Sequence, residues 1–151
     1  MSSDPRNAIS EAALLLTEAQ VSSPQVDAEL LLAHVLGVER NQLTSVNQIS
    51  DEQLFEYEAL VARRANRVPL QHLTGIAYFR YLELQVGPGV LVPRPESELL
   101  VDAVLRNIEG REGVVSVVDL GAGSGALTLA IATEAPQTHL IAVEKDPAAV
   151  E

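Results

Sequence analysis

A glycine-rich segment at residues 118–126, Val-Asp-Leu-Gly-Ala-Gly-Ser-Gly-Ala, carries the residue types that point most clearly to ligand chemistry. One apolar run precedes it and another follows it, which is the pattern of a buried strand, a tight turn and a helix. Glycines in such a turn let the backbone bend sharply and let a ligand approach without meeting a Cβ atom. The first N–H groups of the helix then face that ligand, so the segment predicts a binding loop.

Glu144 is a second candidate, 19 positions after Gly125, at the end of the next apolar run. An acid at the end of the second strand can accept hydrogen bonds from both ribose hydroxyls of a bound nucleoside. The loop and the acid together predict a ligand that contains a nucleoside. The strand-turn-helix-strand context argues against the simplest alternative, which is an ordinary tight turn beside a surface acid.

Asp119 distinguishes between two kinds of ligand. The glycines alone also satisfy the dinucleotide pattern G-x-G-x-x-A, so a nicotinamide-binding dehydrogenase domain is one interpretation. Asp119 lies two positions before Gly121, where dinucleotide-binding folds normally have a small or apolar residue. An acid there would repel a pyrophosphate but attract the cationic sulfonium of S-adenosylmethionine. The sequence therefore favours S-adenosylmethionine, and Asp119 argues against NAD.

This set of residues resembles motif I and the following acidic position of class I methyltransferases. The resemblance implies S-adenosyl-L-methionine as cofactor and S-adenosyl-L-homocysteine as product, with no metal. The residues that it assigns to cofactor binding are Asp119, Gly121, Ala122, Gly123, Ser124, Gly125 and Glu144. Arg94 is a further candidate, because the prolines on either side restrict its backbone. It either lines the cofactor pocket or clamps the domains together.

Two upstream segments narrow the resemblance to one family. Residues 69–75, Pro-Leu-Gln-His-Leu-Thr-Gly, are followed by Phe79, and residues 91–98 read Leu-Val-Pro-Arg-Pro-Glu-Ser-Glu. Together they resemble the HemK/PrmC family of peptide chain release factor glutamine methyltransferases. These enzymes methylate the glutamine side-chain amide in the Gly-Gly-Gln motif of class-1 peptide release factors. The resemblance therefore implies a release factor as partner.

One motif of that family is absent. The family uses a catalytic Asn-Pro-Pro-Tyr motif to hold the glutamine amide, but no asparagine of this chain precedes a proline; the asparagines are Asn7, Asn41, Asn47, Asn66 and Asn107. The chain thus resembles the N-terminal part of such an enzyme, cut within its catalytic domain, with no catalytic residue of its own. We expect it to be inactive alone. Two other hypotheses stay open: a class I methyltransferase acting on nucleic-acid adenine or another protein, and a non-catalytic fragment.

The elements that position these residues fall into three parts. Apolar residues at three- and four-residue spacing predict helices up to about residue 68, with a break at Ser22-Ser23-Pro24. Ser50 and Gln53 fit a capping box at the start of one of these helices. β-prone residues from 78 to 86 predict a short hairpin. A run of valines from 114 to 118 predicts a strand covered on both faces, followed by a helix over 126–134 and a second buried strand over 139–143.

We therefore expect an α+β chain of two domains. Residues 1–72 form a small helical bundle that recognises the substrate, and residues 73–92 form a β-hairpin linker. Residues 93–151 form the start of a class I, Rossmann-like α/β methyltransferase domain that binds S-adenosylmethionine.

Charge and composition narrow the partners and the compartment. The 151 residues include 21 acids and 10 bases, for a net charge of −11, so the chain repels a phosphate backbone and no direct nucleic-acid contact is expected. The absence of cysteine excludes disulfides and thiolate metal sites. No apolar run reaches the roughly 18 residues of a membrane span, and no signal peptide is visible, so a cytoplasmic protein without membrane contact is expected.

Two groups of residues have simpler interpretations than a binding site. The histidines share no metal-binding spacing; they are His34, His72 and His139. A small basic face near a helix end is most simply a solvated surface that favours the helix dipole, with contact to a release factor or to RNA as the alternative. Its members are Arg63, Arg64 and Arg67.

Overall fold

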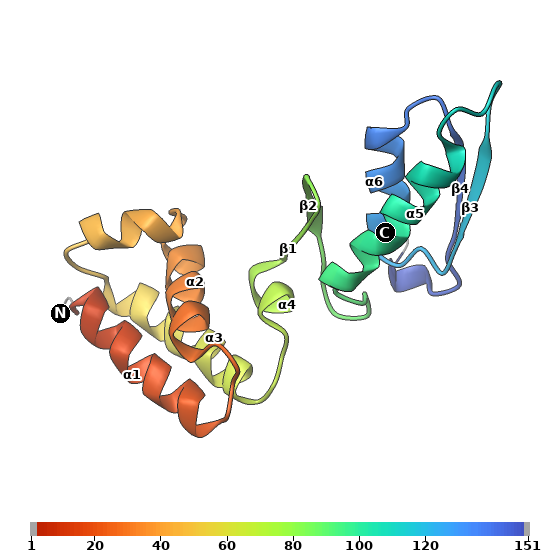
Figure 1. Cartoon of the computed structure of the whole chain (residues 1–151). Coiled ribbons are helices and arrows are strands. Elements are labelled where there is room, and N and C mark those ends of the chain that lie inside the picture. The colour runs from red at the N-terminus through yellow and green to blue at the C-terminus, as the bar shows by residue number, and fades with distance from the viewer. Residues whose placement is uncertain (1–2, 150–151) are drawn as a thin grey trace. The chain divides into compact units, whose positions relative to one another are not determined.

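The computed structural model describes residues 3–149, the side chain of Ala148 excepted, and it divides into two compact units (Figure 1). The first unit extends to Thr74 and the second begins at Gly75. In the described part of the chain, no helix is both long enough and apolar enough to cross a membrane.

The first unit is helical, as predicted. Its elements are α1 (Pro5–Glu18), α2 (Pro24–Leu36), the 3-10 helix η1 (Arg40–Ser45), α3 (Asp51–Ala65) and α4 (Leu70–Thr74). The break before Pro24 is confirmed, and α2 ends at Gly37, which adopts the left-handed conformation with φ +64°. The capping box is confirmed as well: Ser50 Oγ accepts from the Gln53 N–H, and Gln53 Oε1 accepts from the Ser50 N–H.

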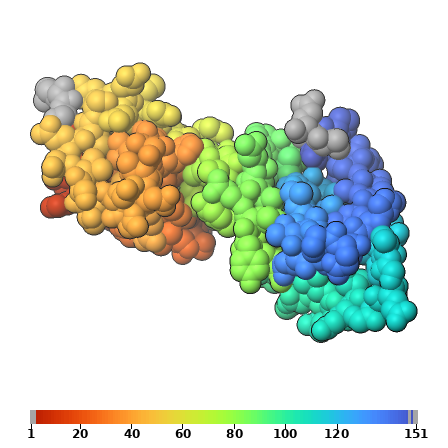
Figure 2. All heavy atoms as spheres, turned by 90° about the horizontal axis from the view of Figure 1, so that it is seen from above, coloured from red at the N-terminus to blue at the C-terminus, as the bar shows by residue number. Residues whose placement is uncertain are grey.

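The core of this unit lies between α1, α2 and α3, where apolar faces meet. The side chains of Leu16, Leu31, Leu32 and Tyr57 are fully buried, and the atoms of these helices, red to yellow in Figure 2, form one packed group. The Tyr57 hydroxyl donates to the Ala28 carbonyl oxygen at 3.0 Å, so its burial leaves no unpaired polar atom. Desolvation, and secondarily the charge of Glu29, raises the pKa of Tyr57.

A buried ion pair joins α2 to α3. Asp27 has an exposed fraction of only 6%, and its Oδ2 accepts from Arg64 Nε at 2.7 Å. Arg64 Nη1 also donates to the Val68 carbonyl oxygen at 3.0 Å. The prediction that Arg64 belongs to a solvated basic face is therefore wrong, because its side chain turns inward to neutralise Asp27, whereas Arg63 and Arg67 are exposed.

The second unit contains a hairpin and a β-α-β arrangement. Its elements are β1 (Ile76–Phe79), β2 (Leu82–Gln85), the 3-10 helix η2 (Pro95–Ser97), α5 (Glu98–Ile108), β3 (Ser116–Leu120), α6 (Ala126–Glu134), β4 (His139–Val143) and the 3-10 helix η3 (Pro147–Ala149). β1 and β2 pair antiparallel, and β3 and β4 pair parallel, with Leu120 opposite Val143. The predicted order of helical bundle, hairpin and start of an α/β domain is confirmed.

The hairpin is part of the core of the second unit. Ala77, Phe79 and Leu84 from the hairpin are buried together with Val101 of α5 and Ala130 of α6. Each strand of the hairpin therefore contributes apolar side chains to one face that packs on helices, as expected for a strand with period-2 burial. A two-stranded hairpin is marginal by itself, so this packing on α5 and α6 stabilises it.

The prediction that β3 and β4 are covered on both faces is wrong for the described residues. β3 begins at Ser116, so Val114 and Val115 of the predicted run lie before the strand, and the exposed fractions of Val118 and Leu120 are 53% and 79%. Val117 and Leu140 pack against the core of α5 and α6, which lie on the same side of the two strands in Figure 1. The alternate side chains point away from both helices, which explains their exposure.

Candidate functional site

The glycine-rich loop connects β3 to α6 through three left-handed residues. Gly121, Gly123 and Gly125 have φ values of +80°, +54° and +74°, a region that residues with a Cβ rarely adopt. A Cβ placed on Gly121 or Gly123 would meet no atom within 4 Å. That side of the loop is open, so these glycines are required by the backbone conformation, and they leave room for a ligand against the main chain.

Backbone hydrogen bonds tie the loop to the end of β4. The N–H groups of Gly121 and Ala122 both donate to the Val143 carbonyl oxygen, at 2.7 and 3.1 Å. Gly125 donates to the Ala122 carbonyl oxygen at 2.8 Å and forms the N-cap of α6. The loop is therefore ordered by its own chain before any ligand binds, which lowers the entropy that a ligand must remove.

Glu144 closes the loop from the end of β4. Its Oε2 accepts from the Gly123 N–H at 2.8 Å, and its Oε1 accepts from the N–H groups of Lys145 and Asp146 at 2.7 and 2.9 Å. These bonds, led by the one from Asp146, lower the pKa of Glu144. The structure thus brings Glu144 against the glycine loop, although its predicted role toward a ribose stays a prediction.

The hydrogen bonds of Glu144 limit how it could bind a ribose. A carboxylate has about four lone-pair positions, and three are used by the chain's own N–H groups. One position on Oε2 remains. Accepting hydrogen bonds from two ribose hydroxyls would require at least one of these backbone bonds to be released.

Asp119 lies near the end of β3 and is half-buried. Its Oδ2 accepts from the Thr128 hydroxyl on the first turn of the helix α6 at 2.6 Å, which orients the carboxylate beside the loop. Thr128 was not a candidate from the sequence. Its spacing of three residues after Gly125, on the first turns of the helix, was the signal that could have indicated it. Asp119 and Glu144 place two acids at the ends of neighbouring strands, a charge pattern that suits a cationic ligand.

Arg94 occupies an extended position just before η2, with φ −93° and ψ 141°. Its carbonyl oxygen accepts from the Ser97 N–H at 2.9 Å, and the residue is exposed. Its backbone is held as the flanking prolines predict, while its proposed place at the cofactor stays a prediction. Among residues 3–149, no three side chains of His, Cys, Asp or Glu come together in a way that could hold a metal ion.

Glu144 gives the site a pH dependence that can be measured. The pKa of Glu144 is lower in the folded chain than in the unfolded chain. Its hydrogen bonds therefore stabilise the fold above the unfolded-state pKa, and this stabilisation is lost as the pH falls through the folded-state pKa. We expect the amide proton shift of Gly123 to stay constant near neutral pH and to change only below the ordinary glutamate value of 4.5. An NMR titration checks this. Glu144→Gln should remove the step, and a midpoint above 4.5 in the unmodified chain would contradict the prediction.

Fold and site together define the class. The second unit has the beginning of a methyltransferase-type α/β domain: an acid near the end of β3, a glycine loop, a helix and an acid after β4. In the sequence, a helical domain precedes it. Comparison with known proteins agrees in both parts. Residues 95–151 match the family described as methyltransferase small domain, and residues 7–75 match the PrmC N-terminal domain.

Several curated proteins named release factor glutamine methyltransferase are similar to the chain. The protein from Mycolicibacterium smegmatis is 50% identical over 146 residues, which cover 97% of this chain and 51% of that protein. The protein from Streptomyces coelicolor is 47% identical over 137 residues (90% and 48%), and that from Escherichia coli is 41% identical over 138 residues (89% and 49%). The chain spans about half the length of these relatives, and the resemblance to release factor glutamine methyltransferases inferred from its motifs is confirmed.

Proposed function

We propose that this chain forms the donor-binding part of an S-adenosylmethionine-dependent enzyme that methylates the glutamine amide in the Gly-Gly-Gln motif of class-1 release factors. The observation that carries the proposal is a glycine loop with free space on one side, with Glu144 hydrogen-bonded to its Gly123 N–H and Asp119 beside it. The names of the relatives support the acceptor, because they are release factor glutamine methyltransferases. We infer that residues 1–72 recognise the release factor, that residues 73–92 link them to residues 93–151, and that the enzyme acts in the cytoplasm.

The residues of this chain would bind and orient the cofactor. When bound, S-adenosylmethionine would supply an electrophilic methyl group on a sulfonium; transfer of that methyl to the glutamine amide nitrogen would break the sulfur–methyl bond, leave S-adenosylhomocysteine and release one amide proton. In this chain, the backbone of Gly121–Gly125 offers a surface without Cβ atoms for the cofactor. Glu144 would accept from a ribose hydroxyl at its remaining lone pair, and the negative charge of Asp119 would favour the sulfonium over an anionic ligand. Ala122 and Ser124 complete the loop, and Arg94 is proposed at its border.

The test is a comparison of two ligands by NMR, because millimolar concentrations detect even weak binding. S-adenosylhomocysteine should shift the amide resonances of Gly121–Gly125, whereas NAD should leave them unchanged. The opposite result would identify a dinucleotide-binding domain. No shift with either ligand would show that the described loop does not form a cofactor site by itself and would contradict the proposal for this chain.

Glu144→Ala should weaken S-adenosylhomocysteine binding by about tenfold or more, because a ribose hydroxyl of the ligand and the Gly123 N–H lose their acceptor. Titration calorimetry or NMR shift titration measures the change in the dissociation constant. Glu109→Ala is a matched control, since Glu109 is an exposed glutamate that follows α5, and its loss should leave the affinity unchanged. Equal affinities for Glu144→Ala and the unmodified chain would remove Glu144 from the site.

A further inference from the structure

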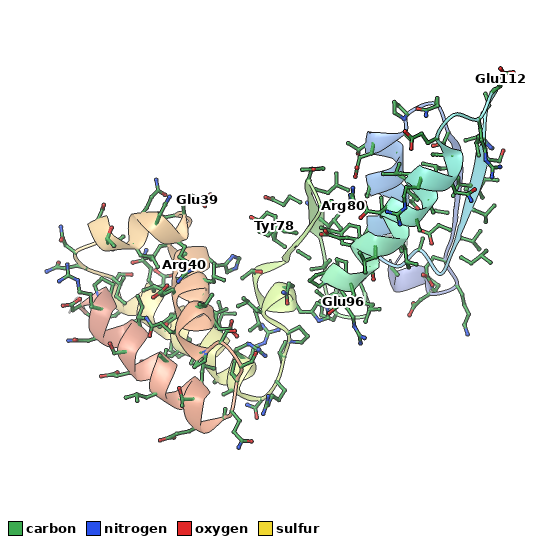
Figure 3. The ribbon with its side chains drawn as sticks, viewed as in Figure 1. Glu39, Arg40, Tyr78, Arg80, Glu96 and Glu112 are labelled. Carbon is green, nitrogen blue, oxygen red and sulfur yellow. The ribbon has the colours of Figure 1, made fainter. Side chains whose placement is uncertain are left out.

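Arg80 lies at the turn of the hairpin, and most of its side chain is covered by neighbouring residues. It is one of three non-glycine residues with positive φ among the described residues, at +52°, and its side chain is 13% exposed. Figure 3 shows it pointing from the hairpin toward α5. The positive φ strains the backbone, and shielding the guanidinium from water also costs free energy, so the surroundings of Arg80 must stabilise it. They do so through partners on two helices.

On one side Arg80 contacts the last residue of α6. Its Nε and Nη2 donate to the two carboxylate oxygens of Glu134, at 2.5 and 2.7 Å. This is a bidentate pair, which fixes orientation as well as distance and which a lysine cannot reproduce. The guanidinium therefore sets where the carboxyl end of α6 lies relative to the hairpin.

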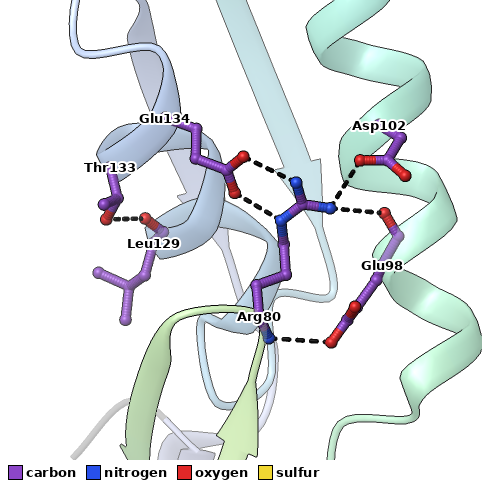
Figure 4. A network of polar contacts seen from close by, with 6 residues as sticks. All are labelled: Arg80, Glu98, Asp102, Leu129, Thr133 and Glu134. Atoms are coloured by element: carbon purple, nitrogen blue, oxygen red, sulfur yellow. Dashed lines mark hydrogen bonds and ion pairs between the residues drawn. The ribbon is translucent and has the colours of Figure 1, made fainter.

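On the other side Arg80 contacts α5 at three points, as Figure 4 shows. Nη1 donates to Asp102 Oδ1 at 2.7 Å and to the Glu98 carbonyl oxygen at 3.3 Å, and the Arg80 N–H donates to Glu98 Oε1 at 2.9 Å. The bonds to Glu134 and then to Asp102 raise the pKa of Arg80, so its charge persists at any pH that the fold tolerates. One arginine thus neutralises acids on two helices of a strongly acidic chain.

Both helices carry candidate cofactor segments at their amino ends. The glycine loop ends at Gly125, the N-cap of α6, and the segment with Arg94 precedes η2 and α5. A short helix moves nearly as a rigid body, so holding its far end restricts the loop at its start. Phe79, next to Arg80, is buried in the same cluster as Ala126 and Ala130 of α6, which gives the hairpin a second hold on this helix.

We propose that Arg80 is a positioning residue for the cofactor loop: by binding α5 and α6 together it keeps the glycine loop in its ligand-ready conformation. The assignment of a cofactor to that loop rests on the proposed function, but the effect of Arg80 on the loop does not. Arg80 makes no contact with a reacting atom in this scheme. It acts through Glu134 and the helix α6.

Hydrogen exchange on the complete 151-residue chain tests this without any ligand. Arg80→Lys keeps the charge but loses the bidentate pair, and the amides of Gly121, Ala122, Gly123 and Gly125 should exchange about 10- to 100-fold faster. Amides of the β3–β4 ladder and of α3 should keep their rates. Arg111→Lys is the matched control, because Arg111 is an exposed arginine of the same unit whose side chain donates to Asn107, four positions earlier in its own segment.

Two results would overturn the proposal. Unchanged loop exchange in Arg80→Lys would show that the loop does not depend on the bidentate pair. A uniform acceleration over the whole second unit would show a role in global stability only. If Arg80→Lys does not fold, Glu134→Gln serves as the milder variant with the same two criteria. The affinity for S-adenosylhomocysteine, measured in parallel by amide shift titration, should fall in Arg80→Lys and not in Arg111→Lys. Absence of binding in all chains would count against the proposed function, whereas the exchange result would still test the role of Arg80.

Discussion

Arg64→Ala is expected to lower the free energy of unfolding of the helical unit by about 3–5 kcal/mol. The substitution leaves the Asp27 carboxylate buried at 6% exposure without its cation, and it also frees the Val68 carbonyl oxygen. Breaking a buried pair costs more than the pair contributes, because the remaining charge stays out of water. For a unit of this size the loss is a large part of its total stability.

Urea unfolding followed by far-ultraviolet circular dichroism measures this change. Arg63→Ala is the matched control, because Arg63 is the neighbouring residue of α3 and is exposed, and its loss should change stability by less than about 0.5 kcal/mol. The double variant Asp27→Ala with Arg64→Ala should be more stable than Arg64→Ala alone, since no buried charge remains. Equal stability of Arg63→Ala and Arg64→Ala would show that the pair is not buried in solution.

The second large effect concerns catalysis: the 151-residue chain alone should transfer no methyl group to a release factor. Binding a donor is not sufficient, because the acceptor nitrogen must be held about 3 Å from the methyl group and in line with the breaking bond. The family resemblance implies that an Asn-Pro-Pro-Tyr motif holds the amide, and this sequence contains no asparagine followed by proline. The roles proposed for the glycine loop and Glu144 concern only the methyl donor.

A radiolabelled-methyl assay with purified chain and purified release factor tests this expectation. Incorporation into the Gly-Gly-Gln glutamine should equal the background without enzyme. A release factor with the glutamine replaced by alanine shows whether any signal comes from that residue. Incorporation above background that depends on this glutamine would mean that catalytic residues lie within these 151 positions and that the motif-based expectation is wrong.

The features that could be predicted from sequence depend on local chemistry. Gly121–Gly125 predicted the turn and the start of α6, and Pro24 with Gly37 marked the bounds of α2, because glycine and proline restrict or release the backbone wherever they stand. Ser50 and Gln53 act over three residues, so their capping box was readable as well. These signals need no knowledge of the tertiary fold.

The features that escaped prediction depend on partners that are distant in the sequence. Arg80 binds Glu134, 54 positions away, and Arg64 binds Asp27, 37 positions away. Nothing near either arginine indicates its partner, although the four-residue spacing of Glu98 and Asp102 placed two acids on one face of α5. The burial of β3 was misjudged for a related reason, since an apolar run shows what a strand can bury but not which layers cover it.

Lys145, whose amide supports Glu144, offers a practical route to watching the loop. It is the one lysine of the sequence, and it is exposed two positions after β4 ends. Apart from the amino terminus, an amine-reactive fluorophore would therefore find a single lysine side chain, in the segment that supports Glu144. Arginines, which supply the other nine basic side chains, do not react with such reagents. With the amino terminus blocked, Lys145 is a natural attachment point from which the arrival of a ligand at Glu144 can be followed as a change in fluorescence.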